Sequence, residues 1–276
     1  LNELKTSLTN PEAAIEARII VEHVLNLDSS ELISNSENQL SRNQVQTMLE
    51  IRDKRNAEKI PLAYILEEAS FAGMKFFVND DVLIPRPETE LLVNLVLDEI
   101  KERKIYQPSI LDLCTGSGCI AISLKQALPS AKVYASDISQ AALNVAGINA
   151  KRHKTEINFI MGDYLDPFLN ISSSPIAVPI MRTEPPYFDL IVSNPPYVTE
   201  EEYAELEPEL YHEPKHALVG FPYKHILRQV QENNLIKENG FMAFEFGFEQ
   251  KDKLSKIFPE AQFYKDLEGH YRFLIS

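Results

Sequence analysis

Apolar side chains recur with the spacing of amphipathic helices over the first seventy residues. After Asn10-Pro11, a pair typical of a helix start, the recurring apolar positions are Ala14, Ile15, Ile19, Ile20, Val24 and Leu27. Asp28 with Glu31 and Ser41 with Gln44 have the spacing of a capping box and predict two further helix starts. Residues 1–70 are therefore expected to form a small helical domain.

The pattern changes between residues 71 and 84. Two extended apolar runs, Phe76-Phe77-Val78 and Val82-Leu83-Ile84, flank the turn-forming tripeptide Asn79-Asp80-Asp81. We expect residues 71–84 to form a β-hairpin linker to a second domain over residues 85–276.

In the second domain, short apolar runs alternate with stretches of helical spacing. Strands are predicted over 110–113, 132–137, 157–161, 188–193, 241–246, 262–267 and 271–275, with helices between them and over 88–101. This alternation predicts a Rossmann-like α/β fold, with a mostly parallel seven-stranded sheet that binds ligands beyond the carboxyl ends of its strands. The Ser- and Pro-rich insertion over residues 170–187 has no clear period and is predicted to be a surface loop.

A glycine-rich turn follows the first strand of this domain and continues into a helix. Its glycines allow the backbone to approach a ligand, and the helix start offers free N–H groups. Asp137 ends the next strand, where a carboxylate can accept hydrogen bonds from two ribose hydroxyls. The candidate cofactor-binding residues are Cys114, Thr115, Gly116, Ser117, Gly118 and Asp137. Because residues 116–121 also fit the dinucleotide pattern G-x-G-x-x-A, the turn alone leaves a nicotinamide oxidoreductase and an S-adenosylmethionine (SAM) enzyme equally open.

The third strand ends on Gly162-Asp163-Tyr164, where the adenine of such a cofactor would lie. Asp163 could accept a hydrogen bond from the adenine amino group, and Tyr164 could pack near its ring. Gly-Asp turns are common, so this signal is weaker than the glycine-rich turn.

Asn194-Pro195-Pro196-Tyr197 follows the fourth strand and favours the SAM enzyme. Two prolines stiffen the turn, so that the Asn194 side-chain oxygen and the Pro195 carbonyl can act as fixed acceptors for the two hydrogens of an –NH₂ group. An amide or aryl amine is a poor nucleophile because its lone pair is delocalised, and fixing both hydrogens favours a pyramidal nitrogen. Tyr197 adds a π-face for the planar group and for the positive charge near the sulfonium. Asn194, Pro195 and Tyr197 are the predicted catalytic residues, and the whole turn, including Pro196, is predicted to bind the substrate.

Charge and cysteine content narrow the classes of protein further. The chain of 276 residues has a formal net charge of −14, which counts against wholesale binding to nucleic acid. Cys114 and Cys119 are too few for a disulfide framework, which favours a reducing cytosol, and no apolar run approaches the length of a membrane span. His212-Glu213-Pro214-Lys215-His216 matches the zinc pattern H-E-x-x-H, but Pro214 opposes the continuous helix that a zinc site needs, so no metal is predicted.

An acidic run follows the catalytic turn directly. Seven of the 41 acidic residues fall between Glu200 and Glu213. Such a run is ordinarily interpreted as a solvent-exposed face. Because it follows Tyr197 closely, a second hypothesis is that its negative charge steers a basic protein substrate toward the site.

Six segments in order along the chain resemble the release factor glutamine methyltransferase family (PrmC, also called HemK). They are Leu83–Glu90, Asp112–Ile122, Ile191–Val198, Glu213–Leu218, Phe244–Gly247 with Gln250, and Lys265–Gly269 with Arg272. The resemblance covers essentially the whole chain and implies a SAM-dependent methyltransferase domain. It implies methylation of the side-chain amide of the glutamine in the Gly-Gly-Gln motif of class 1 peptide chain release factors. It further implies SAM contacts from residues 114–118, Asp137, the Tyr164 region and Asn194, with the glutamine held by residues 194–197. We also predict a monomer in the cytoplasm without direct contact to nucleic acid or membrane, and we assign docking of the protein substrate to the helical domain.

Other interpretations of the same motifs remain open at this point. The Asn-Pro-Pro-Tyr turn also suits an N(6)-adenine DNA or RNA methyltransferase and a ribosomal-protein glutamine methyltransferase, and the glycine turn allows an oxidoreductase or an inactive SAM-binding module. The chain departs from the family pattern at Cys114, where many members have glycine, and at Gly220-Phe221-Pro222-Tyr223, a weakened glycine-rich segment.

Overall fold

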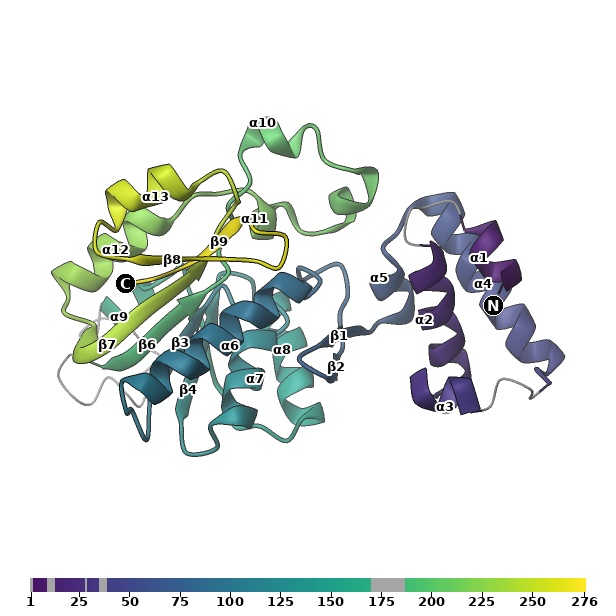
Figure 1. The fold of residues 1–276 in the computed structure, drawn as a ribbon, viewed down its shortest axis with the longest axis horizontal. Coiled ribbons are helices and arrows are strands. Elements are labelled where there is room, and N and C mark those ends of the chain that lie inside the picture. Colours follow the sequence, from purple (N-terminus) through teal and green to yellow (C-terminus); the bar gives the residue numbers. More distant parts are fainter. Residues whose placement is uncertain (1, 9–12, 28, 35–38, 170–186) are drawn as a thin grey trace. The chain divides into compact units, whose positions relative to one another are not determined.

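A computed structural model describes residues 2–8, 13–27, 29–34, 39–169 and 187–276 (Figure 1). The predicted loop over 170–187 lies outside these residues except for Tyr187, which is buried. The chain divides into two compact units. Unit 1 comprises Leu1–Glu68 and Glu207–His212, and unit 2 comprises Ala69–Leu206 and Glu213–Ser276.

Unit 1 is helical, as the apolar spacing predicts. Its elements are α1 (Asn2–Ser7), α2 (Ala13–Leu25), α3 (Ser29–Ser34), α4 (Arg42–Glu58), α5 (Leu62–Leu66) and the 3-10 helix η2 (Pro208–His212). The capping box at Ser41 and Gln44 is confirmed: the Ser41 hydroxyl accepts from the Gln44 backbone, and the Gln44 side chain accepts from the Ser41 backbone. The predicted apolar face of α2 is partly wrong, since Ile15 is 51% exposed and Ile19 is 37% exposed.

An ion-pair cluster lies at the centre of unit 1. The Arg55 guanidinium is 3.0 Å from the Glu16 carboxylate and 2.6 Å from the Glu209 carboxylate. Arg55 and Glu16 are both buried, so each charge needs the other. Glu209 lies 154 positions after Arg55 in the chain and brings the 207–212 segment into the unit.

The hairpin linker forms seven residues earlier than the turn signal at Asn79-Asp80-Asp81 indicates. Its strands are β1 (Ala69–Phe71) and β2 (Met74–Phe76), paired antiparallel around Ala72-Gly73. Both turn residues have positive φ, 50° and 72°, as the tight turn between such strands requires. Residues 79–81 do form a turn, closed by a hydrogen bond from the Val82 N–H to the Asn79 carbonyl, but no strand follows it.

Unit 2 contains the predicted seven-stranded sheet, in the order β5-β4-β3-β6-β7-β9-β8. Its strands are β3 (Ser109–Leu113), β4 (Lys132–Asp137), β5 (Asn158–Met161), β6 (Phe188–Ser193), β7 (Ile236–Glu245), β8 (Gln262–Lys265) and β9 (Tyr271–Ile275). The first five strands of this order pair in parallel, and β9 is antiparallel to both of its neighbours. The predicted fold class is confirmed.

Helices cover both faces of this sheet (Figure 1). One apolar cluster packs the first face against α6 (Pro87–Glu102), α7 (Cys119–Ala127) and α8 (Gln140–Arg152). A second cluster packs the other face against α9 (Asp166–Leu169), α12 (Tyr223–Glu232) and α13 (Lys251–Ile257). Two short helices, α10 (Glu200–Tyr203) and α11 (Lys215–Leu218), lie in the connection between β6 and α12. Both faces are buried, so the carboxyl ends of the parallel strands remain as the place for a site.

Candidate active site

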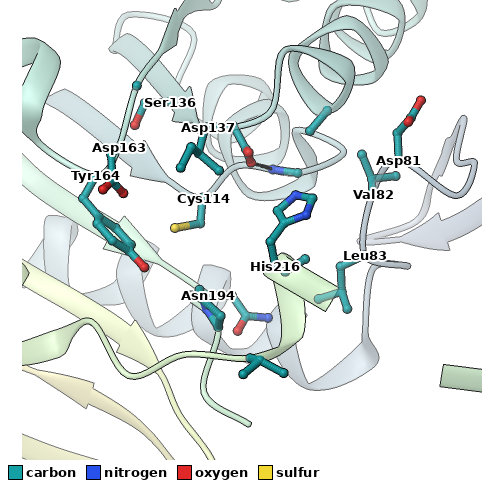
Figure 2. Close-up of a pocket in the computed structure, with 17 residues that line it drawn as sticks. Asp81, Val82, Leu83, Cys114, Ser136, Asp137, Asp163, Tyr164, Asn194 and His216 are labelled. Carbon is teal, nitrogen blue, oxygen red and sulfur yellow. Dashed lines mark hydrogen bonds between the residues drawn. The ribbon is translucent and has the colours of Figure 1, made fainter. Parts of the chain in front are cut away.

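A cavity of about 270 Å³ opens beyond the carboxyl ends of β3, β4, β5 and β6 (Figure 2). Seven of the predicted site residues line it: Cys114, Gly116, Asp137, Asp163, Tyr164, Asn194 and Pro196. In Figure 2 the side chains of Cys114, Tyr164, Asn194 and His216 point toward the same space. The fold thus brings together residues from four separate strand ends.

The glycine-rich turn has left-handed backbone at three positions. φ is 57° at Cys114, 53° at Gly116 and 82° at Gly118. A Cβ on Gly116 would meet nothing within 4 Å, so this glycine faces the open cavity. A Cβ on Gly118 would lie 3.1 Å from the Cβ of Ala146, so this glycine allows the turn to pack against α8. Cys114 is an unusual residue for this backbone conformation, and it is half-buried. The loss of water around its thiol raises the thiol pKa above the ordinary range.

Thr115 and Ser117 stabilise the turn from inside and do not line the cavity. Both side chains are buried. The Thr115 hydroxyl donates to Asp112 Oδ2 over 2.6 Å, and the Ala121 N–H donates to the same oxygen over 3.2 Å. Asp112 Oδ1 is also buried and has no hydrogen-bond partner among the described residues. Burial raises the pKa of Asp112 to about 7.

Asp137 fastens the glycine turn to the end of β4. Its Oδ2 accepts from the Gly116 N–H and its Oδ1 from the Ser139 N–H, each over 2.9 Å. Burial raises the pKa of Asp137, and the two backbone donors act against that rise. The carboxylate still lines the cavity, where it can accept from hydroxyl groups of a ligand.

The charge of the cavity wall distinguishes between the cofactors that the glycine turn allows. Asp81, Asp137 and Asp163 all line the cavity, and its described lining residues include no Lys or Arg. Three carboxylates suit a ligand with a positive sulfonium and an ammonium group, whereas they oppose the two phosphates of a nicotinamide dinucleotide. The residues present therefore fit SAM.

The predicted adenine end of the site has a strained but well-packed backbone. Tyr164 has φ of 42°, and its ring makes an edge contact with His225 at 5.9 Å between centroids. A Cβ on Gly162 would lie 2.0 Å from Cγ of Pro167, so glycine is required at that close approach.

The Asn194-Pro195-Pro196-Tyr197 turn is held on several sides. Both prolines are buried. The N–H groups of Tyr197 and Val198 donate to the Leu218 carbonyl over 3.1 and 2.9 Å, and Gln250 Nε2 donates to the Tyr197 carbonyl over 2.6 Å. A Cβ on Gly220 would lie 2.9 Å from Cγ of Pro196, which explains the glycine in the weakened segment. The turn is therefore rigid, as its two prolines predict.

This turn forms part of the wall of two cavities. Asn194 and Pro196 line the first, whereas Tyr197 lines a second cavity of about 270 Å³. The other residues that line the second cavity are Val198, Glu202, Leu206, Gly247, Phe248, Glu249, Gln250 and Arg272. Pro195 is buried and lines neither.

The sequence reasoning missed several residues of the first cavity. They are Asp81, Val82, Leu83, Ser136, Ile138, Ala142, Gly162, His216, Ala217 and Val219. The motif segments 83–90 and 213–218 are the sequence signal for Leu83, His216 and Ala217, and the Gly-Asp turn after the third strand is the signal for Gly162.

The acidic run after the turn is not uniformly solvated. Glu213 is buried and pairs with Arg86, and Glu209 pairs with Arg55 in unit 1, whereas Glu201 and Glu205 are exposed. The same region does not form the continuous helix of a zinc site, because η2 ends at His212 and α11 begins at Lys215. Among the described residues, no group of three or more His, Cys, Asp or Glu side chains is placed to hold a metal ion.

The sheet order, the glycine turn and the acidic residue at the end of β4 define a class I SAM-dependent methyltransferase. A model of the methyltransferase small domain matches residues 88–220, and a model of the PrmC N-terminal domain matches residues 2–66. The release factor glutamine methyltransferase of Chlorobaculum tepidum is 36% identical over 269 residues, which cover 92% of this chain and 87% of that enzyme. The one from Bacillus subtilis is 39% identical over 229 residues, 78% of this chain and 74% of that enzyme. The chain belongs to the release factor glutamine methyltransferase family.

Solved structures support the fold. One is the T. thermophilus 16S rRNA methyltransferase RsmC in complex with AdoMet and guanosine, with a TM-score of 0.52 at 16% identity. The match covers 76% of this chain and 49% of the RsmC chain. The hMettl16 catalytic domain, bound to an RNA hairpin, has a TM-score of 0.52 at 12% identity, and the match covers 90% of this chain and 91% of that domain. No helix in the described part of this chain is both long and apolar enough to cross a membrane.

Proposed function

We propose that this protein transfers a methyl group from SAM to the side-chain amide nitrogen of the glutamine in the Gly-Gly-Gln motif of class 1 release factors. The observation that carries this proposal is the position of the Asn-Pro-Pro-Tyr turn between two cavities. One cavity has the carboxylates that suit SAM, and the other leaves room for a substrate on the far side of the turn. The choice of release factors as the proposed substrate follows from the similarity to release factor glutamine methyltransferases.

The chain's own residues would hold the cofactor from three strand ends. Gly116 and Cys114 would present the turn backbone to it, and Asp137 would accept hydrogen bonds from its ribose hydroxyls. Asp163 and Tyr164 would contact the adenine end. SAM supplies an electrophilic methyl group on a positively charged sulfur.

The catalytic turn acts on the amide by positioning. Asn194 Oδ1 and the Pro195 carbonyl accept the two hydrogens of the target –NH₂, and Pro196 keeps these acceptors fixed. Tyr197 packs against the planar amide. Because the hydrogens are held, the nitrogen lone pair can be directed at the methyl group, and no side-chain nucleophile is needed. As the nitrogen gains the methyl group, the neutral thioether of S-adenosylhomocysteine would be the leaving group, and the nitrogen would release one hydrogen as a proton.

We assign the docking of the protein substrate to the helical domain of residues 1–70, with residues 71–84 as the linker to the methyltransferase domain of residues 85–276. We also propose that the protein acts as a monomer. The acidic surface fits a protein substrate in the cytoplasm, without direct contact to nucleic acid.

A methylation assay tests the proposal. Labelled SAM is incubated with the protein and a release factor, with the same release factor after its Gly-Gly-Gln glutamine is changed to alanine, and with DNA. We expect label on the unchanged release factor alone. Label on DNA, or label that survives the glutamine change, would contradict the proposed function.

A further inference from the structure

Two buried side chains, Thr89 on α6 and Glu245 at the end of β7, lie behind the catalytic turn. The Thr89 hydroxyl donates to Glu245 Oε2 over 2.7 Å. Asn194 Nδ2 donates to Thr89 Oγ1 over 3.2 Å. The three side chains form a chain of hydrogen bonds from a buried carboxylate to the amide that faces the cofactor cavity.

The direction of these hydrogen bonds follows from the number of protons available. A hydroxyl has one hydrogen, and an ionised carboxylate can only accept. When Thr89 donates to Glu245, its oxygen has only lone pairs left for Asn194. Asn194 must then present its –NH₂ to Thr89, and its Oδ1 lies on the other side of the planar amide.

We propose that Thr89 and Glu245 are positioning residues that set the orientation of the Asn194 amide for methyl transfer. This inference rests on the proposed function, in which Asn194 Oδ1 accepts from the substrate. Without the pair, the amide could turn by half a rotation and offer its –NH₂ to the substrate –NH₂, and two donors cannot bond each other.

The same carboxylate also reaches Tyr197. The Tyr197 hydroxyl donates to Glu245 Oε1 over 3.4 Å. Both ends of the catalytic turn are therefore connected to the Glu245 carboxylate, Tyr197 directly and Asn194 through Thr89. Glu245 is itself held in place, since the Tyr223 hydroxyl donates to its backbone carbonyl over 2.8 Å.

The proton of Glu245 decides the direction of the whole chain of bonds. Burial raises the pKa of Glu245 to about 7, while Thr89, Arg272 and Tyr197 favour its charged form. The titratable and charged groups around it are Glu88 on α6, Cys119 on α7, Tyr197 after β6, Tyr223 on α12 and Arg272 on β9. Protonated Glu245 could donate to Thr89, and the Thr89 hydrogen would then turn toward Asn194 and favour the unproductive amide orientation. Turnover should therefore fall as the pH falls through about 7.

Isosteric variants test this positioning role in the full-length protein. We expect Thr89→Val to lower kcat about 30-fold or more while the Kd for SAM changes less than threefold, as for loss of an interaction used in the transition state. Glu245→Gln should lower kcat similarly and remove the acidic limb near pH 7, because its –NH₂ donates to Thr89 at every pH. Thr89→Ser retains the hydroxyl and should restore kcat to within about fivefold of the wild type.

Thr155→Val is the matched control, because Thr155 lies just after α8 and its hydroxyl donates to the Ala150 carbonyl, away from the catalytic turn. Its kcat should equal that of the wild type. The positioning role is wrong if Thr89→Val retains wild-type kcat, if Thr89→Ser is as impaired as Thr89→Val, or if SAM binding weakens in proportion to kcat.

A readout without substrate separates this inference from the proposed function. Hydrogen exchange of the Asn194 side-chain –NH₂, assigned by NMR with Asn194→Asp, should be about tenfold faster in Thr89→Val than in the wild type. Equal exchange rates would overturn the positioning role even if the release factor is methylated. Wild-type protein that does not methylate the release factor would overturn the proposed function, while faster exchange in Thr89→Val would still support the positioning role.

Discussion

Gly220 and Pro196 show how one missing side chain shapes the catalytic turn. The Gly220 N–H donates to the Val198 carbonyl over 3.0 Å, which brings its Cα against the ring of Pro196. Any side chain at this position must displace either the ring or the strand-like bridge between Val198 and Val219.

Gly220→Ala should therefore displace the turn. We expect a loss of about 1–3 kcal/mol in the free energy of unfolding and a fall in kcat of tenfold or more, because a buried contact is overpacked. The control is Gly147→Ala within α8, where a Cβ meets nothing within 4 Å. That variant should gain about 0.5–1 kcal/mol at unchanged kcat. Urea denaturation and methylation kinetics measure both quantities, and equal behaviour of the two variants would contradict the packing argument.

Asp112 gives a pH dependence of stability whose sign can be worked out. Its pKa is 3.8 when exposed and about 7 in the fold, so the folded state holds the proton more tightly. The contribution of Asp112 to the free energy of unfolding should fall as the pH rises from about 4 to about 7 and be flat above that range. Glu245 contributes in the same direction.

Asp112→Asn should reduce this slope and raise the stability at pH 8 by about 1–2 kcal/mol in protein free of SAM, because a buried charge is removed. Asp98→Asn on the exposed side of α6 is the matched control and should leave the slope unchanged. Urea denaturation at pH 5 and pH 8 measures the change in the free energy of unfolding between the two pH values. If this change is the same in Asp112→Asn and in the wild type, Asp112 is not the source of the pH dependence.

The sequence predicts the residues at the strand ends but not the residues behind them. Asp137, Asp163 and Asn194 each follow an apolar run after one intervening serine or glycine, and this position predicts that they lie at the ligand-binding edge of the sheet. Thr89 and Glu245 are 156 positions apart, so only the packing of α6 against the end of β7 reveals their contact.

At the scale of elements, capping signals predict helix starts well, whereas turn signals locate the hairpin less well. The start of α4 at Arg42 follows from the side-chain geometry of Ser41, which depends on local sequence only. The hairpin depends on burial: Phe71 and Phe76 are fully buried with ring centroids 6.0 Å apart, and this contact selects Ala72-Gly73 as the turn. Asn79-Asp80-Asp81 instead forms a turn that is closed by the Val82 N–H and the Asn79 carbonyl, with added hydrogen bonds between Asn79 and Asp81.

The Ser41 capping box can be tested on its own. Ser41→Ala should lower the stability of unit 1 by about 1 kcal/mol, because the Gln44 N–H loses its acceptor. Ser34→Ala is the control, since the Ser34 hydroxyl bonds a carbonyl within α3 and caps nothing. Hydrogen exchange of the α4 backbone measures the effect, and equal protection in both variants would contradict the capping role.

At the scale of the whole molecule, the part of the −14 net charge that bears on substrate binding is the acidic run after the catalytic turn. Glu201 and Glu205 are exposed after the catalytic turn, whereas Glu209 and Glu213 are used in ion pairs. Only the exposed members can attract a basic substrate through solvent.

Glu201→Lys combined with Glu205→Lys should lower kcat/KM for a basic release factor about tenfold at low salt, and the difference should shrink as salt is added. Turnover at saturating substrate should change less than threefold, because steering acts before the chemical step. Asp98→Lys with Glu102→Lys on exposed positions of α6 makes the same change in net charge. If that pair lowers kcat/KM equally, overall charge rather than this surface guides the encounter.

The ion-pair cluster of unit 1 has a consequence for the order of events during synthesis. Arg55 leaves the ribosome early, but its partner Glu209 follows 154 residues later, after β3, β4, β5 and β6. At roughly 5–20 residues per second, Arg55 and Glu16 wait on the order of ten seconds for the third charge. The helical unit, although encoded first, therefore reaches its final form only once most of the methyltransferase sheet has been translated, and a nascent chain stopped before residue 207 should carry an unfinished unit 1.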